Sequence, residues 1–136
     1  LVRWPREAPA GLRVTQLVQN LDLAPTFLEL AGVTVPEEMD GESLASLLRG
    51  ETPANWRTSV YYEYFERGIH AVEPHSGVRT DRYKLIHFHD SGSWELYDLA
   101  KDPGEMDNRY DDPGLGLVRA KLHQELVRLR AEAGRT

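Results

Sequence analysis

Apolar residues in the first part of the chain recur at the spacing of a helix. Residues 23–31 place them on one face, with Pro25 in the first turn, where a missing backbone donor does no harm, and Gly32 after the end. Asp22 precedes this segment, and we expect its carboxylate to accept hydrogen bonds from the free amides of the helix start. A second, shorter helix is predicted from three leucines that a glycine follows: Leu44, Leu47, Leu48 and Gly50.

Beyond residue 55 the apolar pattern changes from helical to alternating spacing. Residues 60–65 are aromatic and β-branched, which favours a strand. Residues 78–89 predict one long strand, which would pair with residues 94–99 across a tip rich in Gly and Ser. Apolar residues then return at spacings of three and four and predict an amphipathic C-terminal helix: Leu115, Val118, Leu122, Leu126, Leu129 and Ala133.

These elements predict an α+β fold, in which a small antiparallel sheet of three or four strands is packed by the long C-terminal helix. A sheet of this size needs such a cover to be stable. The best internal boundary lies at residues 51–55, so we expect domains at residues 1–52 and 53–136. The first of these carries two helices and little sheet, apart from residues 1–5, which resemble the end of a strand. We expect this first domain to pack on a larger structure.

Composition and charge exclude several functions. The net charge of −6 argues against a nucleic-acid partner, which needs a basic stripe to release counterions. The basic residues of the last helix are interleaved with Glu125 and Glu132, as on an ordinary solvated face. No apolar run approaches membrane-spanning length, so we expect a soluble protein without a membrane partner. The chain opens on Leu1, so a signal peptide cannot be assessed and the compartment stays open.

The chain contains no cysteine, which excludes disulfides, thiolate zinc sites and cysteine nucleophiles. His87 and His89 alternate on a predicted strand at a spacing that suits a metal ion, but two ligands do not close a site. The acidic residues that begin at Asp98 match no calcium-loop template and are explained more simply as turn carboxylates. We therefore assign neither a metal ligand nor a catalytic residue to this chain.

A candidate for substrate binding lies in residues 66–77. This segment is long for a connection between two strands, and long loops on a rigid sheet often carry function. It holds His75, which shortly precedes Arg79, and these two side chains could meet an anionic substrate. The alternative is an exposed loop histidine without a function. We take His75 and Arg79 as the candidate substrate-binding residues.

Short motifs in the second half of the chain make a more specific case. VRTDRYKLI at residues 78–86, WELYDL at 94–99 and KDPGEMDN at 101–108 closely resemble the C-terminal region of the sulfatases. These are the formylglycine-dependent sulfate ester hydrolases of the alkaline-phosphatase-like superfamily. Earlier fragments resemble successive motifs of the same family in the same order: RWP at residues 3–5, NLDLAPT at 20–26, DGESL at 40–44 and YYEY at 61–64.

The resemblance implies that this chain is the C-terminal part of an enzyme that hydrolyses sulfate esters, of a sulfated carbohydrate. Residues up to about 51 would form the rim of the large α/β domain, and the rest a small domain that supports the fold and walls the substrate pocket. His75 is similar to a position from which some carbohydrate sulfatases reach the sugar. The full-length enzyme would use calcium and a formylglycine made within a Cys/Ser-x-Pro-x-Arg motif. That motif is absent here, so we expect this chain alone to bind neither and to be inactive.

The expected partners are the missing N-terminal catalytic domain and a sulfated small molecule or glycan. Separated from that domain, the chain would expose an orphaned interface along Leu23, Phe27 and Leu44, which favours self-association. Two other functions stay open. One is a phosphodiester or phosphonate hydrolase of the same superfamily, and the other is a non-catalytic module that binds a glycan or a protein.

Overall fold

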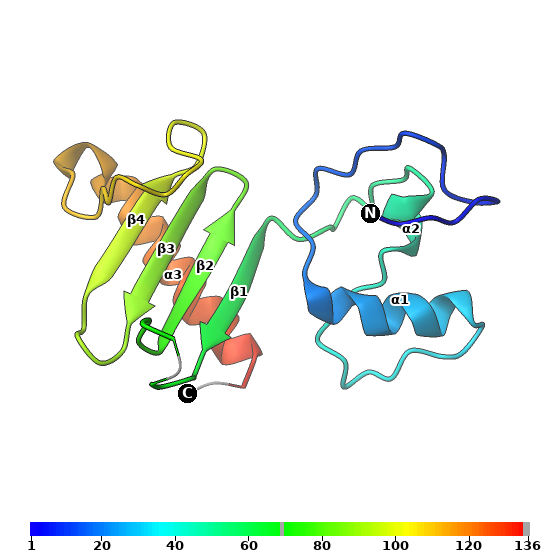
Figure 1. Cartoon of the computed structure of the whole chain (residues 1–136), viewed down its shortest axis with the longest axis horizontal. Helices are drawn as coiled ribbons and strands as arrows, with labels where there is room; N and C mark the ends of the chain where they lie inside the picture. The colour runs from blue at the N-terminus through cyan, green and yellow to red at the C-terminus, as the bar shows by residue number, and fades with distance from the viewer. Residues whose placement is uncertain (69, 135–136) are drawn as a thin grey trace. The chain divides into compact units, whose positions relative to one another are not determined.

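The computed structural model describes residues 1–68 and 70–134, and the chain divides into two compact units, Leu1–Thr58 and Ser59–Thr136. The first unit contains a short 3-10 helix η1 (Asn20–Asp22) and the helices α1 (Leu23–Leu30) and α2 (Ala45–Leu48) (Figure 1). The expected strand end at residues 1–5 is wrong, because no neighbouring strand in the described part of this unit pairs with the segment. None of the helices among the described residues is both long and apolar enough to cross a membrane.

Helix α1 presents its apolar stripe to solvent. Leu23 is 45% exposed and Phe27 is 65% exposed, whereas Pro25 and Thr26 on the same helix are buried. The expected exposure of Leu23 and Phe27 is therefore confirmed. For Leu44 it is wrong, because its backbone N–H donates to Thr26 Oγ1 at 2.8 Å and its side chain is buried where α2 packs on α1.

The second unit is built on a four-stranded antiparallel sheet, as the alternating pattern predicts. Its strands are β1 (Ser59–Tyr64), β2 (His75–Thr80), β3 (Tyr83–Phe88) and β4 (Trp94–Asp98), and they lie in the order β1-β2-β3-β4. Each strand pairs with the next along the chain, so the sheet is a simple meander of hairpins.

A turn interrupts the segment predicted as one long strand. Asp81 and Arg82 separate β2 from β3, and the Thr80 hydroxyl closes the turn by accepting a hydrogen bond from Tyr83 N at 2.9 Å and donating to Tyr83 O at 3.2 Å. The polar run between two apolar stretches was the local signal for this turn. Strand β2 begins earlier than expected, at His75, which pairs with Tyr64 and Phe88 and so lies on the sheet and not in the preceding loop.

Helix α3 (Gly116–Glu132) covers one face of the sheet and follows a short 3-10 helix η2 (Pro113–Leu115) (Figure 1). The core consists of one residue from each of three neighbouring strands and two from the helix: Val78, Leu85, Leu96, Leu122 and Leu126. Val78 pairs with Leu85, and Leu85 pairs with Leu96, so the three form a row across the sheet under the helix. The predicted cover of the sheet by the C-terminal helix is confirmed.

Candidate functional site

The face of the sheet opposite α3 carries the two candidate substrate-binding residues. Because successive strand residues point to opposite faces, His75 and Arg79 share one face of β2, while Val78 lies on the face that α3 covers. They do not converge on one point, since four residues along a strand span about 13 Å. A ligand bound by both side chains would have to extend along β2.

Three aromatic rings surround His75. Tyr64 of β1 and Phe88 of β3 are its direct cross-strand partners, and each ring centroid lies 5.3 Å from that of the imidazole. Tyr64 is stacked on it at 25°, and Tyr62 meets it edge-on at 5.9 Å. His75 Nδ1 lies 2.9 Å from the backbone carbonyl oxygen of Glu73, which makes a hydrogen bond. The ring is thus held from both neighbouring strands and from its own chain.

Between the two candidates, Tyr62 lies over Gly77. A methyl group added at Gly77 would stand 2.5 Å from the phenolic oxygen of Tyr62, so the ring occupies the space that a side chain would take. That oxygen is buried without a hydrogen-bond partner among the described residues. Burial, followed by the nearby carboxylates of Glu105 and Glu95, raises the pKa of Tyr62, so the phenol stays protonated.

Charged residues flank Arg79 on the same face. Its partner Lys84 on β3 binds Glu105 at 2.5 Å and lies 5.7 Å from the centroid of the Tyr62 ring. Arg79 itself is exposed, and no described carboxylate forms an ion pair with it. A guanidinium without a bound carboxylate is suited to an anion from outside the chain.

Three further histidines, His87, His89 and His123, lie on the α3 side of the sheet. His87 is stacked on Trp94 at 4.0 Å, and His123 of α3 lies 4.3 Å from the same indole. Burial lowers the pKa of both rings, and the positive charges of His89 and Arg119 lower the pKa of His87 and His123, respectively, further. His89 makes a hydrogen bond with the Ser76 hydroxyl at 3.0 Å, and its ring centroid lies 5.5 Å from that of His87.

The acidic residues after β4 form a turn. Asp98 binds Arg82 through two hydrogen bonds, and one Asp102 oxygen accepts from the backbone N–H groups of Met106 and Asp107. Among residues 1–68 and 70–134 no group of three or more His, Asp or Glu side chains could hold a metal ion. The described residues therefore do not fit a calcium site, and the chain contains neither a Cys-x-Pro-x-Arg nor a Ser-x-Pro-x-Arg motif.

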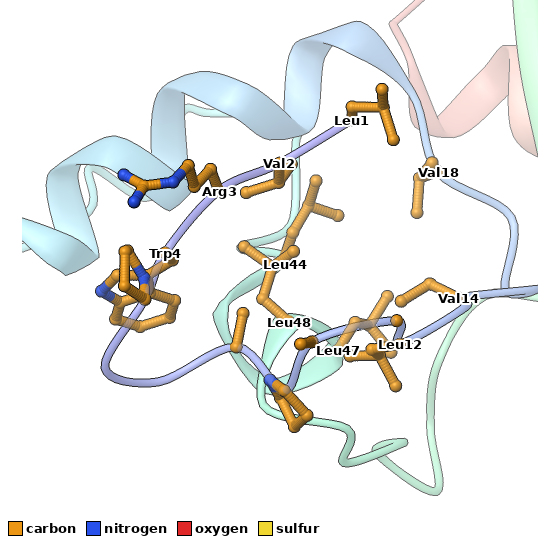
Figure 2. A pocket seen from close by; sticks show the side chains of 15 residues that line it. Leu1, Val2, Arg3, Trp4, Leu12, Val14, Val18, Leu44, Leu47 and Leu48 are labelled. Atoms are coloured by element: carbon orange, nitrogen blue, oxygen red, sulfur yellow. The ribbon is translucent and has the colours of Figure 1, made fainter.

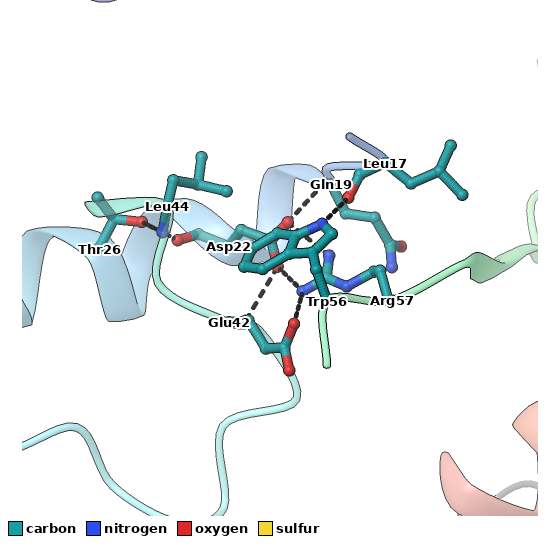
Figure 3. Close-up of polar contacts among 8 residues, drawn as sticks. All are labelled: Leu17, Gln19, Asp22, Thr26, Glu42, Leu44, Trp56 and Arg57. Carbon is teal, nitrogen blue, oxygen red and sulfur yellow. Dashed lines mark hydrogen bonds and ion pairs between the residues drawn. The ribbon is translucent and has the colours of Figure 1, made fainter. Parts of the chain in front are cut away.

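In the first unit, Asp22 is the centre of a buried polar network that the sequence pattern missed (Figure 3). Its carboxylate does not cap α1 as expected. It accepts from the backbone N–H of Gln19 at 2.7 Å and of Glu42 at 3.0 Å, and from both terminal nitrogens of Arg57. Burial raises the pKa of Asp22, but the hydrogen bonds from Arg57, Gln19 and Glu42 outweigh it and hold that pKa below its usual value.

The first unit also contains an open apolar pocket of about 770 Å³ (Figure 2). Leu44, Leu47 and Leu48 line it together with the N-terminal segment, which contributes Val2 and Trp4. The lining is mostly apolar and offers no arrangement of polar groups for chemistry. It resembles an apolar contact surface more than an active site.

These features place the chain in the class of α+β domains in which a long helix covers one face of a small antiparallel sheet. A family model described as N-sulphoglucosamine sulphohydrolase, C-terminal, matches residues 1–132. The chain therefore belongs to the sulfatases, in the region that this family describes as C-terminal.

Individual relatives agree with this assignment. An N-acetylglucosamine-6-O-sulfatase of Bacteroides thetaiotaomicron is 42% identical over 136 residues, which cover 97% of this chain and 24% of the relative. A solved structure of a protein in complex with its substrate D-glucosamine-2-N,6-O-disulfate superposes with a TM-score of 0.91 at 39% identity, over 95% of this chain and 27% of the other. The phosphonate monoester hydrolase of Agrobacterium radiobacter superposes with a TM-score of 0.68 at 31% identity, over 82% of this chain and 24% of that one. This chain thus spans about a quarter of the length of the proteins that it matches.

Proposed function

We propose that this chain is the C-terminal part of a sulfatase that hydrolyses sulfate esters of a sulfated carbohydrate. The observation that carries the proposal is the family match over residues 1–132, together with 42% identity to an N-acetylglucosamine-6-O-sulfatase of which the chain covers 24%. The second unit would support the fold and form one wall of the substrate pocket. Sulfated glucosamine-type sugars are the substrate class that these relatives suggest.

The chemistry itself would come from the part of the enzyme upstream of residue 1. A formylglycine made within a Cys/Ser-x-Pro-x-Arg motif supplies the nucleophile when present, and calcium supplies charge stabilisation. Residues 1–52 would then be the edge of the large α/β domain, and residues 53–136 the small domain. The apolar pocket and the exposed stripe of α1 support this assignment, because both have the character of a surface that a larger partner covers.

Within this chain, His75 and Arg79 are the proposed substrate contacts. The support comes from their common face on β2, the fixed ring of His75, and the absence of a bound carboxylate at Arg79 among the described residues. Arg79 offers N–H donors only, which suits the oxygens of a sulfate or carboxylate. Their separation along β2 suits an extended sugar ligand that places an anionic group at Arg79.

A second candidate is hydrolysis of phosphonate or phosphate diesters. The likeness to a phosphonate monoester hydrolase, with a TM-score of 0.68 at 31% identity, favours it. Both candidates place the nucleophile upstream of this chain, so its own residues do not separate them. The two candidates are separated by the nucleophile motif of the full-length product and by the leaving group that this product accepts.

The test uses the full-length gene product. Intact mass and peptide mapping would look for an aldehyde at the first residue of a Cys/Ser-x-Pro-x-Arg motif. Sulfate release from D-glucosamine-2-N,6-O-disulfate would be measured beside hydrolysis of a phosphonate monoester. We expect sulfate release that is abolished when the motif residue is replaced by Ala, and no turnover by residues 1–136 alone. A full-length product without the motif and without sulfate release would refute the proposal, and preferred phosphonate hydrolysis would favour the second candidate.

A further inference from the structure

The hydrogen bond between His75 and Glu73 determines the tautomer of the imidazole. A backbone carbonyl oxygen can only accept, so Nδ1, 2.9 Å from Glu73 O, must carry the hydrogen and donate it. A neutral imidazole carries a single ring hydrogen. In the neutral form of His75, Nε2 is therefore an acceptor with a free lone pair.

Nε2 is available to a ligand. No described residue makes a hydrogen bond with it, and it is not one of the fully buried polar atoms without a partner. The Tyr62 hydroxyl on the same face differs, since it is buried against Gly77 and out of reach of a ligand. The Tyr64 hydroxyl donates to Glu66 at 3.1 Å, so among the polar atoms on the rings around His75, Nε2 is the accessible one without a partner among the described residues.

The neighbouring rings hold this orientation before a ligand arrives. Tyr64 stacks on one side of the imidazole from β1, and Phe88 contacts it from β3, each as its register partner. Rotation of the ring would break the stacking and the bond to Glu73 together. A side chain ordered in advance loses less conformational entropy on binding, so the ligand gains the full value of its hydrogen bond.

We propose that Tyr64 and the Glu73 carbonyl are positioning residues, which present His75 Nε2 as an acceptor to a hydroxyl or N–H group of the substrate. The inference rests on the proposed function and refines it. Sulfate oxygens only accept hydrogen bonds, so the acceptor nitrogen of a neutral His75 binds hydroxyl or N–H groups of the sugar and not the sulfate ester. Arg79, which only donates, is left to contact the anionic groups.

The first test concerns the tautomer and needs no catalysis. In a chain labelled with ¹⁵N, a long-range ¹H–¹⁵N correlation spectrum at pH 8, where imidazole side chains are neutral, reports which ring nitrogen carries the hydrogen. We expect His75 to show a protonated Nδ1. His70, which is exposed and lies 3.5 Å from Glu66, serves as the control without a fixed carbonyl partner. A protonated Nε2 at His75 would overturn the inference.

The second test compares two substitutions in the full-length enzyme. His75→Asn keeps an amide near the position of Nδ1 but has no group at Nε2, whereas the longer side chain of His75→Gln can place an acceptor there. We expect His75→Asn to lower kcat/KM about 10- to 100-fold, mainly through KM, because the lost bond holds a part of the substrate that does not react. His75→Gln should retain most of the activity, and the matched control His70→Asn should match the wild type.

Tyr64 provides the third comparison. Tyr64→Ala removes the stacked ring and should raise KM about threefold to tenfold, and Tyr64→Phe, which keeps the ring, should regain most of that loss. Wild-type kinetics for His75→Asn would overturn the role of Nε2. A wild-type enzyme that releases no sulfate would refute the proposed function and with it the substrate contact, while the spectrum would still decide the tautomer.

Discussion

Arg57 binds Asp22 through both of its terminal nitrogens, with 2.6 Å from Nη1 to Oδ2 and 2.8 Å from Nη2 to Oδ1. The carboxylate is completely buried, and the guanidinium also lies 5.0 Å from the centroid of the Trp56 ring. The indole N–H of Trp56 donates to Leu17 O at 3.0 Å. These contacts attach the end of the first unit to the start of α1, so the pair carries more of that unit's stability than a surface ion pair would.

Replacing Arg57 by Ala should lower the free energy of unfolding by about 3–5 kcal/mol, because it leaves a buried carboxylate without its counter-charge. Arg57→Lys keeps the charge but loses the two-pronged geometry, so a smaller loss is expected. Urea denaturation followed by circular dichroism measures both. Arg67→Ala, which breaks an exposed pair with Asp90, is the matched control and should change the stability by less than about 1 kcal/mol. Equal losses for Arg57→Ala and Arg67→Ala would contradict the role of the buried pair.

Gly77→Ala should destabilise the second unit. The added methyl group would stand 2.6 Å from the backbone oxygen of Leu85 as well as 2.5 Å from the Tyr62 hydroxyl, and the backbone of a paired strand cannot yield without loss of register. Overpacking of this kind costs about 1–3 kcal/mol. The midpoint of thermal unfolding reports it.

The control for Gly77 is Gly116→Ala. Gly116 opens α3 with ordinary helical backbone angles, and no atom lies within 4 Å of the position of an added methyl group. Alanine is the better helix former, so this variant should be as stable as the wild type or more stable by up to about 1 kcal/mol. A Gly77→Ala protein as stable as Gly116→Ala would show that the Tyr62 ring and β3 adjust freely.

Acid should weaken the packing of α3 on the sheet. The pKa values of His87 and His123 are lowered from 6.5 in the folded chain, so the unfolded chain takes up protons first as the pH falls. The stability contributed by the two neutral rings is present above pH 6.5 and decreases below it. We expect the thermal midpoint to fall between pH 7.5 and 5.5, and to fall less in the double variant His87→Gln, His123→Gln.

His70→Gln is the control for this pH dependence, because the His70 side chain is 64% exposed and packs against neither α3 nor the core. It should show the same fall in the midpoint as the wild type. If the thermal midpoint of the double variant falls with pH as much as that of the wild type, His87 and His123 do not cause the pH dependence of the stability.

The exposed stripe of α1 should cause residues 1–136 to self-associate when they are produced alone. Replacing Leu23 and Phe27 by Ser should weaken the association at least about tenfold, since each buried apolar side chain contributes about 1.5–3 kcal/mol. Sedimentation velocity over a range of concentrations measures the effect. Leu117 and Val127 of α3 are 84% and 68% exposed, and their replacement by Ser should leave the association unchanged. A chain that stays monomeric at all concentrations would contradict this prediction.

The amino-acid sequence by itself determined the element types and the family. The spacing of Leu122 and Leu126 predicted the helix that covers the sheet, and alternation around Leu85 and Leu96 predicted the strands beneath it. These properties are local, because the period of the apolar positions sets which face of an element is buried. The motifs at residues 78–86, 94–99 and 101–108, taken together in their order and spacing, indicated the family without any knowledge of their contacts.

Only the tertiary structure decided which side chains meet. The partners of Asp22 lie 20 and 35 residues away, at Glu42 and Arg57, and no local pattern relates them. His75 lies on the sheet because β2 begins at that residue, and the strand register places Tyr64 and Phe88 beside it. Such contacts depend on register and packing between distant segments, which the periodicity of a single segment does not encode.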